Sequence, residues 1–218
     1  MFKDFANVWT IVGLARDLKR DRPLAMRVAG ERVVFFRDAA GKACALLDQC
    51  PHRGVALSLG RVDNGVIECP FHGWRFDGAG RNCHVPWNPD AKQENLGAAA
   101  LPCREAGGLL WLYAGFHPSE EPEPSPTLTA LHNVSLCAQS VTWKAHWTRV
   151  MENMLDSPHL PFVHRSTIGR DLSKSVGAGR LEMTFELRPY GGHISASVDG
   201  SPRAGNMDYR VPNVMELF

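Results

Sequence analysis

The segment from Cys50 to Trp74 constrains this chain more than any other. It begins with CPHRG at residues 50–54 and ends with CPFHGW at residues 69–74, so each half offers one thiolate and one imidazole. The sixteen residues 53–68 separate His52 from Cys69. Two sulfur ligands and two imidazoles suit either zinc or an iron–sulfur cluster with mixed ligands. The segment therefore predicts a metal centre held between two loops.

Zinc is the alternative to an iron–sulfur cluster at this centre. Zinc fingers usually pair two cysteines at one knuckle and two histidines at the other. Here each loop mixes cysteine with histidine and also contains Pro and Gly. That composition favours two short loops that close over a two-iron cluster from opposite sides. One iron then takes both sulfurs and the other both imidazoles, which raises the reduction potential above that of an all-cysteine cluster.

The pattern Cys-x-His, sixteen residues and Cys-x-x-His resembles the Rieske [2Fe–2S] motif. The following Gly73-Trp74-x-Phe76 resembles the oxygenase branch of that family. The resemblance implies that Cys50 and Cys69 hold an inner iron of the cluster. It also implies that His52 and His72 hold an outer iron near solvent.

The charge balance gives no support for two classes of partner. The chain has 24 Lys and Arg against 23 Asp and Glu, a net charge of +1, so nothing argues for binding to nucleic acid or to an anionic membrane. Charges at Lys3, Asp4, Arg16 and Asp17 interrupt the first twenty residues. We therefore expect no secretory signal and no membrane span.

Four of the six cysteines lie outside the two loops and have no motif spacing: Cys44, Cys83, Cys103 and Cys137. In an oxidising compartment these four could form disulfides. The simpler interpretation is reduced and mostly buried thiols in a cytoplasmic protein.

Short β-rich segments alternate with turn signals up to residue 116, which predicts an all-β sandwich or barrel over 1–116. The expected strands and hairpins are residues 7–14, 24–28, 33–37, 43–47, 62–68, 75–77, 81–84 and 109–113. The segment Ala29-Gly30-Glu31 predicts a tight hairpin turn. Residues 117–127 hold four prolines and three glutamates, which predicts an extended linker. Residues 128–218 then form a second domain.

A strand over 134–143 and an amphipathic helix are expected at the start of the second domain. The apolar residues of the helix fall at i, i+3, i+4, i+7 and i+8 and form one stripe: Trp147, Val150, Met151, Met154 and Leu155. Asn153 and Asp156 are three residues apart and are expected close together on that helix. Ser157 as N-cap and Pro158 as first helical residue predict that a new turn starts there.

His159 and His164 follow at a spacing of five residues. On a straight α-helix such residues point about 140° apart and do not easily bind one ion. Pro161 lies between them and favours an irregular backbone, so a shared metal requires a bend. Taken alone, the two histidines would be interpreted as ordinary structural residues, and Asp156 as a helix C-terminal or capping carboxylate.

The spacing of Asn153, Asp156, His159 and His164 resembles the mononuclear-iron motif of Rieske non-haem iron oxygenase α subunits. The resemblance implies that the two histidines and one carboxylate form a facial triad on Fe(II), which leaves positions for O₂. It also implies that Asp156 bridges an iron-ligating histidine to a Rieske histidine of a neighbouring subunit. Such a bridge requires a ring of subunits, usually a homotrimer.

The third, acidic iron ligand of that family lies far downstream in a longer chain. Six carboxylates follow His164, and none matches that context: Asp171, Glu182, Glu186, Asp199, Asp208 and Glu216. Alternating segments at 180–188, 193–198 and 208–211 predict the first hairpins of an antiparallel sheet, which makes the second domain α+β. Such a partial sheet leaves an edge and an apolar face uncovered. We therefore expect either that the sheet continues beyond residue 218 or that assembly covers it.

The resemblance implies an oxygenase. A flavin- or ferredoxin-type reductase supplies electrons to the [2Fe–2S] cluster and then to Fe(II), which activates O₂ to hydroxylate or demethylate a small, typically aromatic substrate. Two alternatives stay open. An electron carrier or an inactive form would lack a complete iron site, holding about two irons where an oxygenase holds about three. A structural zinc protein would be colourless and redox-inactive.

Overall fold

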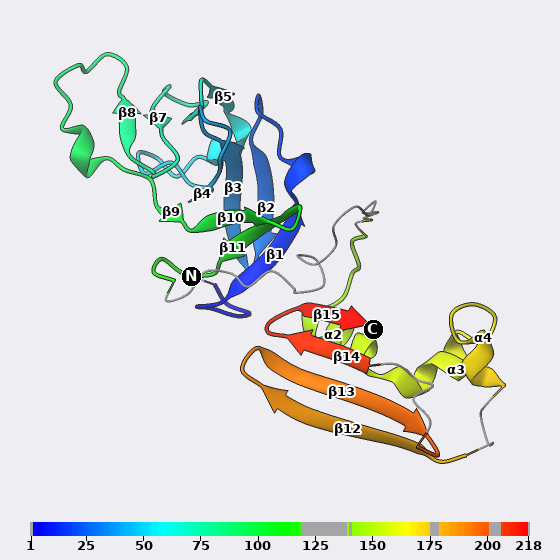
Figure 1. Ribbon diagram of the computed structural model, residues 1–218. Coiled ribbons are helices and arrows are strands. Elements are labelled where there is room, and N and C mark those ends of the chain that lie inside the picture. The colour runs from blue at the N-terminus through cyan, green and yellow to red at the C-terminus, as the bar shows by residue number, and fades with distance from the viewer. Residues whose placement is uncertain (1, 119–138, 140, 175–178, 201–205, 218) are drawn as a thin grey trace. The chain divides into compact units, whose positions relative to one another are not determined.

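A computed structural model describes residues 2–118, 139, 141–174, 179–200 and 206–217. The chain divides into two compact units, Met1–Ser140 and Val141–Phe218, which we describe separately (Figure 1). The predicted linker (117–127) and the predicted strand (134–143) lie mostly outside these residues. Their few described positions form neither strand nor helix. Within the described ranges, no helix is long and apolar enough to cross a bilayer.

The described part of the first unit is built from three antiparallel sheets (Figure 1). The first has the order β1 (Trp9–Leu14), β11 (Leu109–Tyr113) and β10 (Cys103–Ala106). The second has the order β2 (Leu24–Val28), β3 (Glu31–Arg37), β4 (Ala43–Leu47) and β9 (Ala100–Leu101). The third has the order β5 (Arg61–Asp63), β6 (Val66–Glu68), β7 (Arg75–Phe76) and β8 (Asn82–His84). Short 3-10 turns lie at η1 (Ala15–Asp17), η2 (Leu57–Leu59) and η3 (Gln93–Asn95).

Two hairpin turns show how local chemistry sets these strands. Ala29 and Gly30 both have positive φ, +45° and +84°, which is the two-residue turn that matches the twist of paired strands. The predicted turn is therefore confirmed, but β3 begins at Glu31, two residues earlier than expected. Asn64 and Gly65 repeat the same geometry, with φ of +48° and +80°, and divide the predicted segment 62–68 into β5 and β6.

The continuous apolar segment Val33–Phe36 in β3 is fully buried because its side chains pack alternately into two hydrophobic cores. Successive side chains of a strand point to opposite faces. Val33 and Phe35 therefore pack with the first sheet, whereas Val34 and Phe36 pack in a second core that includes Cys50 and Cys69. The strand thus connects the two predicted ligand loops to the body of the unit.

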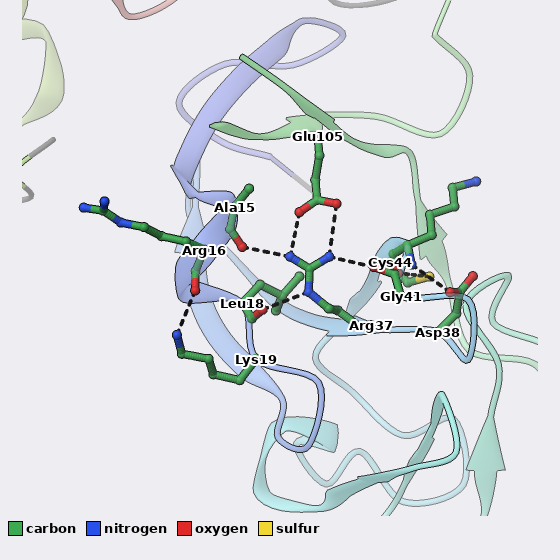
Figure 2. A network of polar contacts seen from close by, with 10 residues as sticks. Ala15, Arg16, Leu18, Lys19, Arg37, Asp38, Gly41, Cys44 and Glu105 are labelled. Atoms are coloured by element: carbon green, nitrogen blue, oxygen red, sulfur yellow. Dashed lines mark hydrogen bonds and ion pairs between the residues drawn. The ribbon is translucent and has the colours of Figure 1, made fainter. Parts of the chain in front are cut away.

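Arg37 at the end of β3 joins three segments of the first unit (Figure 2). Its guanidinium donates to the backbone carbonyl oxygens of Ala15, Leu18 and Gly41 at 2.7–2.9 Å. It also meets both carboxylate oxygens of Glu105 on β10, at 2.7 and 3.0 Å. The hydrogen bond with Glu105 raises the pKa of Arg37 against the opposing effect of burial. The guanidinium therefore stays charged and fixes η1 and β10 to β3.

The second unit is α+β, as predicted. It contains α2 (Trp147–Leu155), η4 (Ser157–His159), α3 (Leu160–Val163) and α4 (Arg170–Ser173). A four-stranded antiparallel sheet follows in chain order: β12 (Leu181–Arg188), β13 (Gly191–Val198), β14 (Asn206–Arg210) and β15 (Val214–Leu217) (Figure 1). The predicted hairpins are confirmed, with β14 beginning two residues before the expected strand.

One face of this second sheet is apolar and only partly covered. Ile194 and Ala196 on β13 and Met207 on β14 are buried. The cross-strand partners of that face on β12 include Met183 and Phe185, which are 42% and 59% exposed. In the described residues β12 pairs with β13 alone. The expectation of an edge strand beside an uncovered apolar face is therefore confirmed for this part of the chain.

Candidate functional site

The first predicted ligand loop follows β4 and has a defined backbone. The Cys50 N–H donates to the carbonyl oxygen of Val55 at 2.8 Å, and the Gly54 N–H donates back to the Cys50 carbonyl oxygen at 2.8 Å. Gly54 has a φ of +74°, which glycine adopts without steric cost. The loop therefore turns tightly and carries the exposed His52 at its outer side.

The second loop joins β6 to β7 and repeats the same backbone pattern. The Cys69 N–H donates to the carbonyl oxygen of Trp74 at 2.8 Å, and the Gly73 N–H donates to the Cys69 carbonyl oxygen at 3.0 Å. Gly73 has a φ of +71°, close to that of Gly54. The two CP-containing segments are thus two copies of one loop, and the second carries the exposed His72.

The two cysteines lie on the inner side of these loops. Cys50 and Cys69 are each 2% exposed and belong to the second core. The pKa of the Cys50 thiol is raised to about 11, chiefly by burial and also by a hydrogen bond with the Cys69 thiol, while backbone hydrogen bonds from His52 and Arg53 act in the opposite sense. The two sulfurs therefore face each other in an apolar setting. A cation would stabilise their thiolate forms there.

The two histidines lie on the outer side. The ring centroids of His52 and His72 are 4.8 Å apart, and the ring planes are inclined at 59°. Burial lowers the pKa of His52, and so do the nearby positive charges of His72 and Arg53. Neutral imidazole is the form that binds a metal. The arrangement therefore presents two imidazoles beside each other at the surface.

These four side chains fit a mixed-ligand [2Fe–2S] cluster better than zinc. A zinc site would gather all four around one ion. Across the residues that the structure describes, no group of three or more His, Cys, Asp or Glu side chains is placed to hold one ion. Two sulfurs inside and two imidazoles outside match instead a centre whose two metals take two protein ligands each.

A salt-bridge network that no sequence motif indicates stabilises the second loop. Glu68 and Arg75 are cross-strand partners on either side of it, and the Arg75 Nε donates to Glu68 Oε2 at 2.8 Å. Arg61 also meets Glu68, at 3.0 Å. Burial acts to raise the pKa of Glu68, but the hydrogen bonds from both arginines outweigh it and lower the pKa. Only the register of β5, β6 and β7 brings these three charges together.

The second predicted motif lies around the end of α2. The predicted helix is confirmed over Trp147–Leu155, but Asp156 is past its end, with φ −94° and ψ 79°. The expectation that Asn153 and Asp156 both lie on the helix is therefore wrong. They remain neighbours because the Asp156 N–H contacts the Asn153 carbonyl oxygen at 3.4 Å. The new turn starts at Ser157 as expected, but Asp156 occupies the N-cap position.

The bend predicted between the two downstream histidines is present. The backbone passes from the 3-10 turn η4 to the short helix α3, and His164 lies just after that helix. The ring centroids of His159 and His164 are 5.3 Å apart, with planes at 64°. The Nδ1 of His159 hydrogen-bonds the Asp156 carbonyl oxygen, and a carboxylate oxygen of Asp156 lies 3.6 Å from the same nitrogen.

This second pair could supply two imidazole ligands to a metal. Because Nδ1 of His159 is engaged with Asp156, its Nε2 is the nitrogen left for a metal. In the described ranges, no carboxylate is placed to join His159 and His164 as the third ligand of one metal ion. The geometry there fits two ligands of a facial triad and leaves its acidic position unassigned.

Comparison with known proteins adds two family matches. Residues 8–102 match the Rieske [2Fe-2S] domain, and residues 143–186 match the vanillate O-demethylase oxygenase C-terminal domain. The first match contains both ligand loops. The second contains Asn153, Asp156 and the two downstream histidines.

Individual relatives agree with these matches. Chlorophyllide a oxygenase of Chlamydomonas reinhardtii is 35% identical over 75% of this chain and 25% of its own length. The oxygenase component of dicamba O-demethylase from Stenotrophomonas maltophilia is 29% identical over 92% of this chain and 60% of its own. The structure of NdmA from Pseudomonas putida CBB5 shares the fold, with a TM-score of 0.77 and 23% identity over 97% of this chain and 63% of that one. The chain spans between a quarter and three fifths of the curated relatives it matches.

Proposed function

This chain belongs to the Rieske oxygenases, and from that membership we propose that it forms the electron-accepting and iron-binding part of an oxygenase. Its [2Fe–2S] cluster and a mononuclear Fe(II) serve an O₂-dependent hydroxylation or demethylation of a small organic substrate. The observation that carries the proposal is the pairing of two buried sulfurs, Cys50 and Cys69, with two exposed imidazoles, His52 and His72.

Each residue of the first site has a role that follows from its position. Cys50 and Cys69 bind the inner iron as thiolates, and their burial keeps water away from the sulfurs. His52 and His72 bind the outer iron at the surface, where a donor protein can approach. When bound, the cluster supplies one-electron transfer at a potential above that of an all-cysteine cluster.

The second site has two candidate ligands for a single metal ion. His159 and His164 would hold Fe(II), which would supply O₂ activation. Asp156 orients His159 through its backbone carbonyl oxygen, and its carboxylate remains 56% exposed. That exposure supports the role of a bridge to a Rieske histidine of a neighbouring subunit in a homotrimer. Asn153 lies next to Asp156 and holds the same turn.

The partners follow from this chemistry. A flavin- or ferredoxin-type reductase supplies the electrons, O₂ is the oxidant, and the protein works in the cytoplasm without nucleic acid or a membrane. The names of the relatives, which include an O-demethylase and a chlorophyllide oxygenase, support oxidation of an organic substrate.

Iron analysis tests the proposal. The protein is purified anaerobically, reconstituted with iron and sulfide, and reduced with dithionite. We expect about two irons in a Rieske-type centre with the corresponding electron paramagnetic resonance (EPR) signal, and further iron that depends on His159 and His164. A colourless zinc protein, or a brown protein without that signal, would overturn it.

A second candidate, an electron carrier, has one observation in its favour. No described carboxylate completes a three-ligand group with His159 and His164. The same iron analysis separates the two functions, because a carrier retains its full iron content when both of these histidines are replaced by Ala.

A further inference from the structure

Trp74 makes an aromatic contact with the opposite ligand loop. Its indole and the imidazole of His52 are stacked, with ring centroids 4.6 Å apart and planes inclined at only 3°. The other exposed imidazole has a different neighbour, because Phe71 meets His72 at 4.0 Å with an inclination of 38°. Parallel, offset stacking is a favourable arrangement for two π systems. The contact therefore singles out one of the two proposed histidine ligands.

The backbone and the core hold the indole in place. The carbonyl oxygen of Trp74 accepts the Cys69 N–H, and its side chain is half-buried against the second core. The next residue, Arg75, is tied to Glu68. His52, by contrast, is exposed on a loop, and the second torsion of a histidine side chain has a broad energy well. The fixed partner of the stack is therefore Trp74, and His52 is the partner it orients.

The stack also makes the two loops unequal. Val55 occupies in the first loop the position that Trp74 occupies in the second, since its carbonyl oxygen accepts the cysteine N–H in the same way. Valine has no ring to lay against an imidazole. His52 therefore has a flat apolar cover from the opposite loop, whereas His72 has two tilted neighbours, Phe71 from its own loop and His52 itself.

The geometry points to Trp74 as a positioning residue that fixes the His52 imidazole and lowers the reduction potential of the proposed cluster. This inference rests on the proposed function. The indole covers one face of the imidazole and excludes water from it. Its electron-rich face also lies next to the outer ligand.

The direction of the effect follows from charge. One electron from the donor converts one of two ferric ions to ferrous iron. With two thiolates, two sulfides and neutral imidazoles, the centre passes from neutral to a single negative charge. Water stabilises that negative charge more than an apolar cover does. Removal of the indole therefore favours the reduced form and raises the potential.

The test measures the potential and the EPR spectrum of the reconstituted protein with Trp74→Leu, which keeps an apolar side chain, and with Trp74→Phe, which keeps a ring. We expect a threefold to tenfold shift of the one-electron equilibrium toward the reduced form in Trp74→Leu, at most about 59 mV. We also expect broadened EPR features from mixed His52 orientations. Trp74→Phe should restore most of both properties.

Two controls isolate the stack. Trp87→Leu removes an indole that is fully exposed, and Val55→Ala changes packing at the equivalent position of the first loop. Both should keep the wild-type potential.

An unchanged potential in a cluster-bearing Trp74→Leu protein, or an equal shift in Val55→Ala, would overturn the inference. Should Trp74→Leu not retain iron, retention by Trp74→Phe supports the need for a ring, and loss from both counts against it. A wild-type protein without the Rieske signal would instead refute the proposed function.

Discussion

His159 and His164 lie with their ring centroids 5.3 Å apart, although five residues of straight helix would point them in different directions. The change from the 3-10 turn η4 to α3 brings the two imidazoles together. A paired arrangement of this kind is needed for two histidines to share a metal ion.

Replacement of His164 by Ala should therefore remove the second metal site and leave the first intact. We expect iron bound outside the cluster, or Co²⁺ used as a spectroscopic probe, to bind at least tenfold more weakly. The measurement is a metal titration together with the EPR signal of the cluster. His193→Ala is the matched control, because His193 is paired with Asp208 at 2.7 Å on the sheet. Equal losses in both variants would contradict the assignment.

His52→Cys should lower the reduction potential of the cluster. An anionic thiolate replaces a neutral imidazole and disfavours the additional negative charge of the reduced state. Spectroelectrochemical titration of the reconstituted protein measures the shift. The control is His84→Cys, which places a thiol at another exposed histidine of the first unit. If the cluster assembles in His52→Cys with an unaltered potential, His52 is not a ligand.

Arg37→Met should reduce the free energy of unfolding by about 2–3 kcal/mol, because three carbonyl oxygens and the Glu105 carboxylate lose a charged donor. Chemical denaturation followed by circular dichroism measures this change. Arg81→Met is the control, since the Arg81 side chain is 81% exposed and its pair with Asp77 should contribute well under about 1 kcal/mol. Similar values for the two variants would show that the Arg37 contacts add little to stability.

Gly65→Ala should destabilise the first unit more than Gly108→Ala. Both glycines have positive φ, +80° and +73°, so each substitution carries a backbone cost of about 1 kcal/mol. At Gly65 an added Cβ would lie 1.9 Å from the backbone nitrogen of Ala39, whereas at Gly108 it would meet nothing within 4 Å. We expect a difference of at least about 2 kcal/mol in the free energy of unfolding. Equal destabilisation by the two substitutions would mean that the turn at Gly65 can move away from the backbone of Ala39 without a cost in free energy.

Much of the organisation could be predicted from local chemistry alone. The spacing of Cys50, His52, Cys69 and His72 predicts a two-metal centre, because ligand type and loop length restrict the choice of metal. Alternating apolar residues and short β-rich runs predict most strands of both units, and β3 with its continuous run Val33–Phe36 is an example of the second kind. Pro161 indicates the bend before His164. All of these signals act within a few residues of chain.

Other features depend on contacts between distant segments. The sequence motif places Asp156 on a helix, but α2 ends at Leu155 and leaves Asp156 outside the helical region, with φ −94° and ψ 79°. The Glu68–Arg75 pair depends on strand register, and the Arg37–Glu105 contact joins residues 68 positions apart.

The sequence by itself determined which side chains can bind metal and roughly where strands begin, since both are properties of residue type and short spacing. Only the tertiary structure decided that Trp74 lies against His52, because a face-to-face contact between rings on two loops requires strands of two different sheets, β4 and β6–β7, to pack around one core. Local preferences carry no information about that distance, which the packing of the second core sets.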